Sequence, residues 1–333
     1  MKILVTGADG LLGSNLIREL ISRQYEVSAL VQEDRTYITL VGLPISIIKG
    51  DLRDAKSINN ACSTIDVVIH CAANTSMFPP RQEAVKRVNI SGTQNIIDAC
   101  KLNKVKRLIY VGTANSFNSG SIDHPGNETN AYTATKYGLD YMDSKYEAQQ
   151  IVLKEVANGT LDALVVNPTF MIGPYDSRPS SGEMILGIYF KKIPGYTLGG
   201  KNFVAVKDVA FAIANSITLG QKGQCYILGH ENLSYKEAFE KISTVLNVPA
   251  LKFKLSTGLV RLYGNINSFL GKFLPYNPKI SRELAILASE SHFYSSQKAI
   301  TELKMPQTPL EIAIAECYAW FDENNYLKKS TSI

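Results

Sequence analysis

Two tyrosine–lysine pairs in the stretch YTATKYGLDYMDSK, residues 132–145, have a spacing suited to proton transfer. Tyr132 lies four residues before Lys136, and Tyr141 lies four residues before Lys145. On a helix, residues four positions apart share a face, so an ammonium group can lie beside a phenol, stabilise its phenolate and lower its pKa. Such a tyrosine can donate or accept a proton near neutral pH. The pairs are nine residues apart, on roughly opposite faces of one helix, so at most one faces a common site.

The predicted helix length favours the second pair. The next strand begins near Leu161. A helix that started at Tyr132 would have about 26 residues and span roughly 39 Å, far longer than the strands it covers, whereas one from Gly138 would have about 20 residues. Tyr141 and Lys145 then lie in its first two turns, near the carboxyl ends of the strands, where ligands bind in such sheets. Tyr132 is expected in the loop before the helix.

Short β-branched runs alternate with longer helical patterns up to residue 170. The strands are continuously apolar, as expected for a parallel sheet covered by helices on both faces. This alternation predicts a doubly wound α/β domain. The expected strands are 2–6, 26–31, 45–49, 66–71, 107–111 and 161–167, and the expected helices are 11–23, 55–62, 82–103 and 138–157.

The pattern changes after residue 170. Gly, Pro and Ser interrupt residues 173–200, and short helices and small strands follow. We therefore predict a dinucleotide-binding domain at 1–170 and a smaller substrate-binding lobe at 171–333, packed against it with some crossover of the chain.

A glycine-rich turn, TGADGLLGS, follows the first strand and contains Gly7, Gly10 and Gly13. Glycines between a strand and a helix let the backbone turn tightly and approach a pyrophosphate, whose charge meets the helix N-terminus. Leu11 and Leu12, where the helix begins, are included among the predicted cofactor contacts. The alternative is a turn that needs glycine for structural reasons alone.

The residues after the second and third strands bear on the choice of nucleotide. An acidic residue after the second strand would select NAD, and an arginine would accept a 2′-phosphate. This position offers Gln32, with Arg35 a little further on, and no carboxylate at the tip, which favours NADP, with NAD as the alternative. Asp51 could reach the adenine amino group while Leu52 packs on the ring. Asp51 could instead cap the next helix, a role equally open to Asp54.

Composition excludes several classes of protein. The chain has 333 residues, 45% of them hydrophobic and 20% charged, and a formal net charge of +5, which is weak support for nucleic-acid binding. Five scattered cysteines without a framework, and an N-terminus without a signal-peptide layout, predict a cytoplasmic protein. The sequence contains no membrane span, no metal-binding spacing of histidines and no hydrolase Gly-x-Ser-x-Gly motif.

The chain resembles the extended short-chain dehydrogenase/reductase family over nearly its whole length. The similar segments, in order, are TGADGLLGS, GDLRD, HCAAN, VNISGTQNII, LIYVGTANS, YMDSK and VVNPTFMIGP. NPTFMIGP and the later YILGHENLSYKEAFEKI most resemble the dihydroflavonol-4-reductase-like branch of this NAD-dependent epimerase/dehydratase family. The resemblance implies a Rossmann-type fold and NAD(P) binding. It also implies oxidation, reduction, epimerisation or dehydration of alcohols, ketones or nucleotide sugars, without specifying the substrate.

The resemblance also implies catalytic residues. Thr113 matches a Ser or Thr that holds the substrate oxygen, with Ser116 as the competing candidate. The family pattern Tyr-x-x-Ser-Lys followed by Glu-Ala is met by YMDSKYEA and not by YTATKYGL. Tyr141 is therefore the expected acid/base. Lys145 is expected to lower its pKa and to bind the nicotinamide ribose.

Further matches imply cofactor contacts and an assembly. Asn89 matches an asparagine that orients the backbone of a neighbouring strand near the nicotinamide, and Ala72 and Ala73 match small residues beside the cofactor. Pro168, in VVNPTFMIGP, is also a predicted cofactor contact. Family members often dimerise through helices at the positions of 82–103 and 138–157, so a homodimer is expected.

We interpret the protein as an NAD(P)H-dependent reductase or dehydrogenase acting on a carbonyl or secondary alcohol of a small organic substrate. One alternative is a nucleotide-sugar epimerase or dehydratase with tightly bound NAD, which uses the same three residues. Another is a non-catalytic dinucleotide sensor, which would not need Thr113, Tyr141 and Lys145 together.

The stretch 256–275 has apolar residues at helical spacing. They are Leu259, Leu262, Tyr263, Ile266, Phe269, Leu270 and Phe273. Such a stripe is typical of a core or a dimer interface, and a hydrophobic lid over the substrate is the alternative. A membrane-surface helix is disfavoured because the polar face carries only Arg261 and Lys272.

Overall fold

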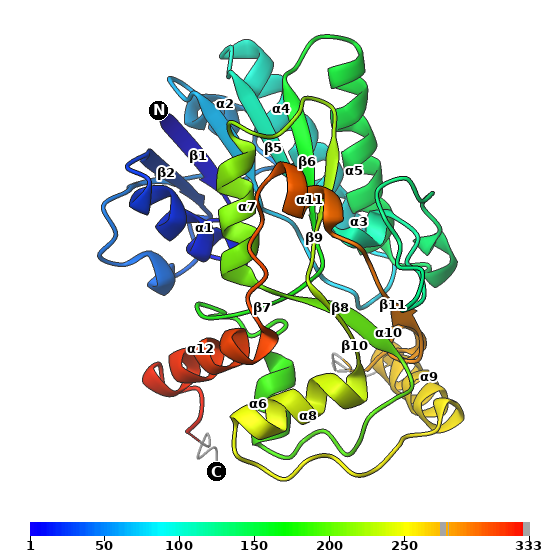
Figure 1. The fold of residues 1–333 in the computed structure, drawn as a ribbon. Helices are drawn as coiled ribbons and strands as arrows, with labels where there is room; N and C mark the ends of the chain where they lie inside the picture. Colours follow the sequence, from blue (N-terminus) through cyan, green and yellow to red (C-terminus); the bar gives the residue numbers. More distant parts are fainter. Residues whose placement is uncertain (274–277, 279, 329–333) are drawn as a thin grey trace.

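A seven-stranded parallel sheet is the centre of the larger part of the molecule (Figure 1). The computed structural model describes residues 1–273, 278 and 280–328. The strand order is β3-β2-β1-β4-β5-β6-β9. The strands are β1 (Lys2–Thr6), β2 (Glu26–Val31), β3 (Ser46–Lys49), β4 (Val67–His70), β5 (Arg107–Val111), β6 (Ala163–Pro168) and β9 (Cys225–Leu228). The order reverses between β1 and β4, which opens a crevice at the carboxyl ends of these strands.

Helices cover both faces of this sheet. Alternate residues of β1 point to opposite faces, so that Ile3 and Val5 belong to one core cluster and Leu4 to the other. The helices of the first face are α1 (Leu11–Ser22), α7 (Val206–Ser216) and α11 (Gln297–Glu302). Those of the second are α2 (Ala55–Ala61), α4 (Gly92–Leu102) and α5 (Asp140–Ala157). The fold is the predicted doubly wound α/β fold.

The predicted strands and helices agree with the observed ones to within two residues at their ends. One predicted helix, 82–103, is divided: α3 (Glu83–Lys86) passes through a π-helical turn (Arg87–Ser91) into α4. Short 3-10 turns lie at Ile38–Leu40, Ala114–Ser116 and Ala134–Tyr137.

A second, four-stranded sheet lies beneath the first in Figure 1. Its strands are β7 (Phe170–Ile172), β8 (Gly200–Ala205), β10 (Glu231–Ser234) and β11 (Ser291–His292). Three helices share its core cluster: α6 (Glu183–Tyr189), α8 (Tyr235–Val245) and α12 (Leu310–Glu323). Because α7, β9 and α11 come from beyond residue 170 yet complete the larger part, the chain returns to the larger part twice after first leaving it.

Two helices flank this second part, α9 (Thr257–Phe273) and α10 (Arg282–Leu287). α9 contains the apolar stripe noted above, and residues 274 and 275 of the predicted stretch lie outside the described residues. The expectation that the stripe is core is wrong, because all seven of its side chains are exposed. No helix in the described part of the chain combines the length and hydropathy that crossing a membrane requires.

Candidate active site

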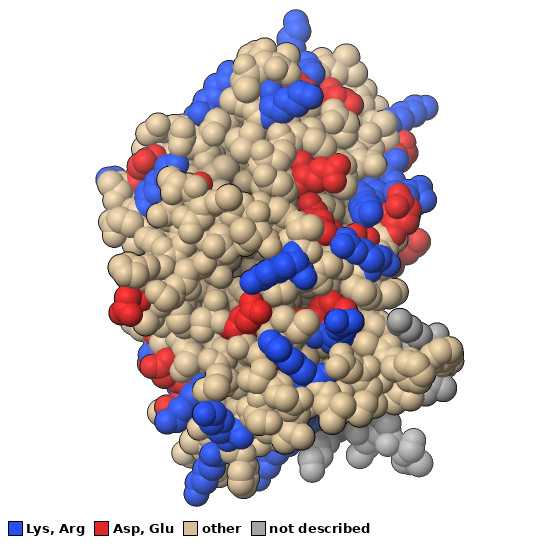
Figure 2. All heavy atoms as spheres, turned by 90° about the vertical axis from the view of Figure 1, so that its right-hand side faces the viewer, with Lys and Arg blue, Asp and Glu red and all other residues tan. Residues whose placement is uncertain are grey.

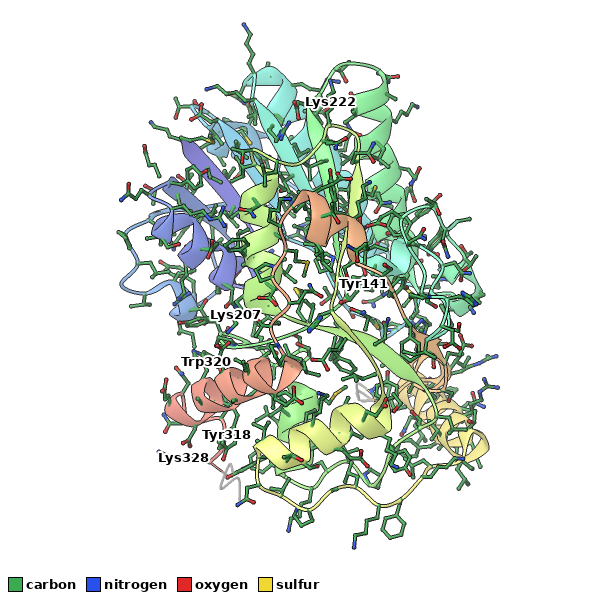
Figure 3. All side chains as sticks on the ribbon, in the orientation of Figure 1. Tyr141, Lys207, Lys222, Tyr318, Trp320 and Lys328 are labelled. Atoms are coloured by element: carbon green, nitrogen blue, oxygen red, sulfur yellow. The ribbon has the colours of Figure 1, made fainter. Side chains whose placement is uncertain are left out.

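A cleft of about 1100 Å³ lies at the carboxyl ends of the parallel strands, between the two parts of the molecule. Figure 3 shows Tyr141 in the middle of the molecule, between the large sheet and the small one. Most of the predicted site residues line this single cleft. They are Gly7, Gly10, Leu11, Leu12, Gln32, Arg35, Asp51, Leu52, Ala72, Ala73, Thr113, Tyr141 and Pro168.

At Gly7 and Gly13 the glycine-rich turn brings the backbone too close to its neighbours to leave room for a side chain. Gly7 has φ of +65°, and a Cβ there would lie 2.7 Å from the backbone of Ala72. A Cβ at Gly13 would lie 2.2 Å from the carbonyl oxygen of Gly7. Gly10 is the N-cap of α1 and has no side-chain cap, so the first amides of α1 face the cleft without a protein acceptor at the cap. These features fit a pyrophosphate-binding turn.

Beyond the turn, the cleft continues to β2 and β3. Gln32 and Arg35 lie on its wall after β2, in a turn closed by the bond from Arg35 N to Gln32 O. Asp51 also lines it, but its carboxylate binds the Arg53 guanidinium, which lowers the Asp51 pKa. The capping role belongs to Asp54, whose side chain accepts the Lys56 N–H at the start of α2. Sequence reasoning missed Arg53, a second arginine at this end of the cleft.

The first turn of α5 is fixed by Asp140, one residue before Tyr141. Its buried carboxylate accepts the Gln82 N–H at 2.7 Å and pairs with Arg81 Nη1 at 2.7 Å. Burial raises the pKa of Asp140, but these partners outweigh it and hold the pKa below its ordinary value. A carboxylate at a helix N-terminus also suits the helix dipole. The position of Tyr141 thus depends on contacts from outside its own helix.

The phenol of Tyr141 and the hydroxyl of Thr113 lie together in the cleft. Burial raises the pKa of Tyr141, and a hydrogen bond with Thr113 lowers it by less. Thr113 is placed by its position at the start of a 3-10 turn, where its Oγ1 accepts the Asn115 N–H. Ser116 is buried and lies outside the cleft lining. Of the two candidates for the hydroxyl, only Thr113 borders the cleft.

Lys145 lies behind the cleft wall rather than on it. Only 3% of it is exposed, and its Nζ donates to the carbonyl oxygen of Val111 at 2.6 Å. Burial lowers the pKa of Lys145 to about 7, against an opposing effect of Cys71. We expected Lys145 to lower the pKa of Tyr141, but the pKa of Tyr141 is raised. The reason is that burial has the largest effect on the pKa of both residues. In addition, the Lys145 ammonium donates its hydrogen bond to the Val111 carbonyl.

The other pair does not form a proton-transfer site. Tyr132 lies in the loop before α5, as expected, and its hydroxyl donates to Asp143 Oδ1 at 2.6 Å. Its ring stacks on Tyr146 with centroids 4.1 Å apart. Lys136 is on the 3-10 turn and pairs with Glu290. Tyr132 and Lys136 are therefore directed to different partners, away from each other.

Asn89 is buried in the π-helical turn, and its contacts support the cleft from behind. Its side chain accepts the Asn74 N–H at 2.8 Å and donates to the Asn74 carbonyl and to Ser144 Oγ. Asn74 lines the cleft after β4, and Ser144 is next to Lys145. Asn89 thus connects the segment after β4 to α5 without lining the cleft itself.

The far end of the cleft contains Lys201 and His292, which pair in register on β8 and β11. The Nε2 atom of His292 is buried and has no hydrogen-bond partner among the residues that the structure describes. Burial lowers the pKa of His292 to about 4, helped by Lys201, and burial lowers that of Lys201 to about 8. The ammonium of Lys201 lies 4.9 Å from the centroid of the Phe170 ring. These groups were missed as a pair because 90 residues separate them.

An ion pair lies at the cleft lining beside the glycine-rich turn. Arg178, in the loop after β7, binds Asp9 with an Nη2–Oδ2 distance of 2.7 Å. Both residues line the cleft. The pair connects the second part of the molecule to the turn, which no local sequence pattern indicates.

Comparison with known proteins gives consistent matches. The model of the NAD dependent epimerase/dehydratase family matches residues 3–229. The "Putative dihydroflavonol 4-reductase" of Synechocystis sp. is 30% identical over 329 residues, which are 97% of this chain and 95% of that protein. The 2-alkyl-3-oxoalkanoate reductase of Stenotrophomonas maltophilia is 26% identical over 93% of this chain and 96% of that protein. The crystal structure of gox2253 is 30% identical, with a TM-score of 0.86 over 98% of this chain and 99% of that one.

Proposed function

The chain belongs to the NAD dependent epimerase/dehydratase family, as its motifs predicted, and we propose that it is an NAD(P)H-dependent reductase or dehydrogenase of a small organic carbonyl or secondary alcohol. The observation that supports this proposal most directly is that Tyr141 and Thr113 lie together in the cleft that begins at the glycine-rich turn. The two relatives compared above are named as reductases, which supports this direction of chemistry.

The mechanism follows from the environments of three residues. A bound nicotinamide dinucleotide supplies the hydride in reduction and accepts it in oxidation. Because burial raises the pKa of Tyr141, its phenol stays protonated at neutral pH and donates that proton to the carbonyl oxygen as negative charge develops there. The Thr113 hydroxyl donates a hydrogen bond to the same oxygen and holds it against the phenol. The amine of Lys145 donates to the Val111 carbonyl before the reaction, and its protonated fraction supplies positive charge for the phenolate that forms on Tyr141 only when the proton has left.

We propose NADP as the preferred cofactor, for two reasons. Gln32 follows β2 where NAD-selective sites have a carboxylate. Arg35 lies beside it on the cleft wall, exposed, where a guanidinium can pair with a 2′-phosphate. Arg53 adds positive charge at the same end, although Asp51 neutralises part of it.

The far end of the cleft supports a substrate with a polar or anionic group near its reacting carbon. Lys201 and His292 offer an ammonium and an unpartnered ring nitrogen there. An ammonium over an aromatic ring keeps N–H donors that can bind a polar or anionic group of the substrate. Leu284 and Met77 also line the cleft, so the cleft offers a substrate both polar and apolar contacts.

Cofactor binding tests this proposal through Gly10. A Cβ at Gly10 would come no closer than 3.4 Å to protein atoms, so Gly10→Val is expected to fold while its side chain fills the space of the pyrophosphate. We expect saturable binding of NADPH, tighter than that of NADH and reversible on dialysis, and at least a tenfold loss of affinity in Gly10→Val. The affinities are measured by fluorescence titration, with the unfolding temperature as the control for folding.

Two results of this titration would contradict the proposal. Unchanged affinity in Gly10→Val would place the dinucleotide elsewhere. NAD that co-purifies and resists dialysis would favour a nucleotide-sugar epimerase or dehydratase.

If Arg35 holds a 2′-phosphate, Arg35→Ser is expected to weaken the binding of NADPH and to leave the binding of NADH unchanged.

A further inference from the structure

The helix α9 carries a large apolar surface that faces away from the protein. Seven side chains on one side of it are each 40% to 72% exposed. They are Leu259, Leu262, Tyr263, Ile266, Phe269, Leu270 and Phe273. At about 100° per residue they form one continuous stripe along the helix. Soluble monomers rarely leave a patch of this extent uncovered.

Close packing on the opposite side of α9 fixes this orientation. A Cβ at Gly264 would lie 2.7 Å from the Cβ of Ala285 on α10, and one at Gly271 would lie 2.8 Å from the ring of Phe78. Val260, on the same side, is buried. The helix therefore rests on its small residues and cannot turn its stripe inward without separating from α10.

The segment that contains α9 is strongly basic. Between Glu240 and Glu283 the sequence has no acidic residue, and residues 251–282 contain Lys252, Lys254, Arg261, Lys272, Lys279 and Arg282. Arg261 and Arg282 line a small cleft of about 230 Å³ between α9 and α10, together with Asn265 and Ile286. Figure 2 faces this side of the molecule and shows, at its lower right, a tan area without acidic side chains that has basic side chains along its inner edge.

We propose that α9 docks on an anionic lipid bilayer. The helix lies in the plane of the interface, with its apolar stripe at the boundary of headgroups and acyl chains and with Arg261 and Arg282 beside the lipid phosphates. Amphipathic helices with basic flanks bind membranes in this way, through apolar burial and attraction to anionic lipids. A membrane-surface helix was disfavoured above because α9 itself contains only Arg261 and Lys272. Arg282 on α10, and Lys252 and Lys254 before α9, add basic charge beside the helix.

A second copy of the chain fits this surface less well than a membrane does. A two-fold interface through the stripe would place the same basic segment opposite itself. Like charges face to face at an interface cost free energy, and the segment has no carboxylates to offset them. An anionic bilayer supplies both the apolar layer and the negative charge.

Docking would bring the cleft to the membrane. Leu284 on α10 lines the cleft, and so does Met77, next to the Phe78 that packs under α9. If the proposed function holds, an apolar substrate could then reach the cleft from the bilayer. This consequence rests on the proposed function, whereas the docking itself does not.

Vesicle co-sedimentation of the full chain tests the proposal. The probes are vesicles of phosphatidylcholine alone and of equal parts phosphatidylcholine and phosphatidylglycerol. We expect binding to the mixed vesicles that weakens as salt is raised, and little binding to phosphatidylcholine alone. The double variant Leu262→Gln/Phe269→Gln is expected to weaken binding at least about tenfold, because two exposed apolar groups no longer insert. Arg261→Gln/Arg282→Gln should reduce both the binding and its salt dependence.

A matched control replaces two exposed apolar residues elsewhere, Ile38 and Val41. Ile38→Gln/Val41→Gln is expected to bind vesicles as the native chain does. Absence of binding to mixed vesicles would overturn the proposal. So would a native dimer, seen by analytical ultracentrifugation, that Leu262→Gln/Phe269→Gln converts to a monomer. NADPH affinity is expected to be the same in all these variants, which separates this test from that of the cofactor site.

Discussion

Replacing Tyr141 by Phe is expected to lower kcat/KM by about 10³-fold or more, the upper range for the loss of a general acid in a positioned site. The variant removes one oxygen atom and keeps the ring that fills the cleft wall. The contacts of Asp140 with Arg81 and Gln82 hold the start of α5 without help from this hydroxyl. NADPH affinity and the unfolding temperature should therefore stay close to native values, and both should be measured beside the kinetics.

The matched control is Tyr132→Phe. Tyr132 belongs to the other Tyr-x-x-x-Lys pair but donates its hydroxyl to Asp143 and stacks on Tyr146. Loss of this hydrogen bond to a carboxylate is expected to cost about 1–3 kcal/mol of stability, with turnover nearly unchanged. An active Tyr141→Phe variant, or an inactive Tyr132→Phe variant that still folds, would show that the wrong tyrosine has been chosen.

Replacing Lys145 by Met is expected to lower kcat/KM by about 10²-fold or more, because the phenolate of Tyr141 loses its cation. The pH profile distinguishes this role from a structural one. The pKa of Lys145 is lowered to about 7 by burial, so the ammonium is progressively lost as pH rises through that value. In the native protein kcat/KM for reduction should fall above pH 7. The profile of Lys145→Met should be flat there, and Lys145→Arg, which stays protonated, should recover part of the activity without that fall.

The stability of the protein without cofactor gives an independent check on Lys145. Its pKa is lower in the folded state than in the unfolded state, so the unfolded chain binds more protons between about pH 7 and the ordinary lysine pKa. The free energy of unfolding should therefore rise with pH across this window because of Lys145. The rise should be smaller in Lys145→Met. Parallel stability curves for the two proteins would mean that the pKa of Lys145 is not lowered.

Local patterns were sufficient to predict the larger part of the fold. Continuous apolar runs such as that of β1 indicate strands covered on both faces, and helix length separated Tyr141 from Tyr132. The glycine-rich turn was recognisable because its context, strand then helix, is local. All of these features depend on residues within about one element of each other.

The features that were missed depend on distant contacts. Lys201 and His292 meet only because β8 and β11 pair, and the ion pair of Asp9 with Arg178 forms across the two parts of the molecule. Burial sets the direction of the Tyr141 pKa shift, and the spacing of residues along a helix does not predict burial. The stripe of α9 has a periodicity that is equally compatible with a core helix. What turns it outward is the fit of Gly264 against Ala285.

A deuterium label shows directly whether the protein reduces a carbonyl carbon with net transfer of hydride from the cofactor. The protein is incubated with NADPH deuterated on either face of the nicotinamide C4 and with a panel of ketones, aldehydes and 3-oxo acids, and products are analysed by mass spectrometry. We expect deuterium from one face on the new carbinol carbon, with one cofactor oxidised per product formed and no transfer by Tyr141→Phe. Conversion of nucleotide sugars with no net oxidation of cofactor, or cofactor binding without transfer to any member of the panel, would show that the protein is not a carbonyl reductase.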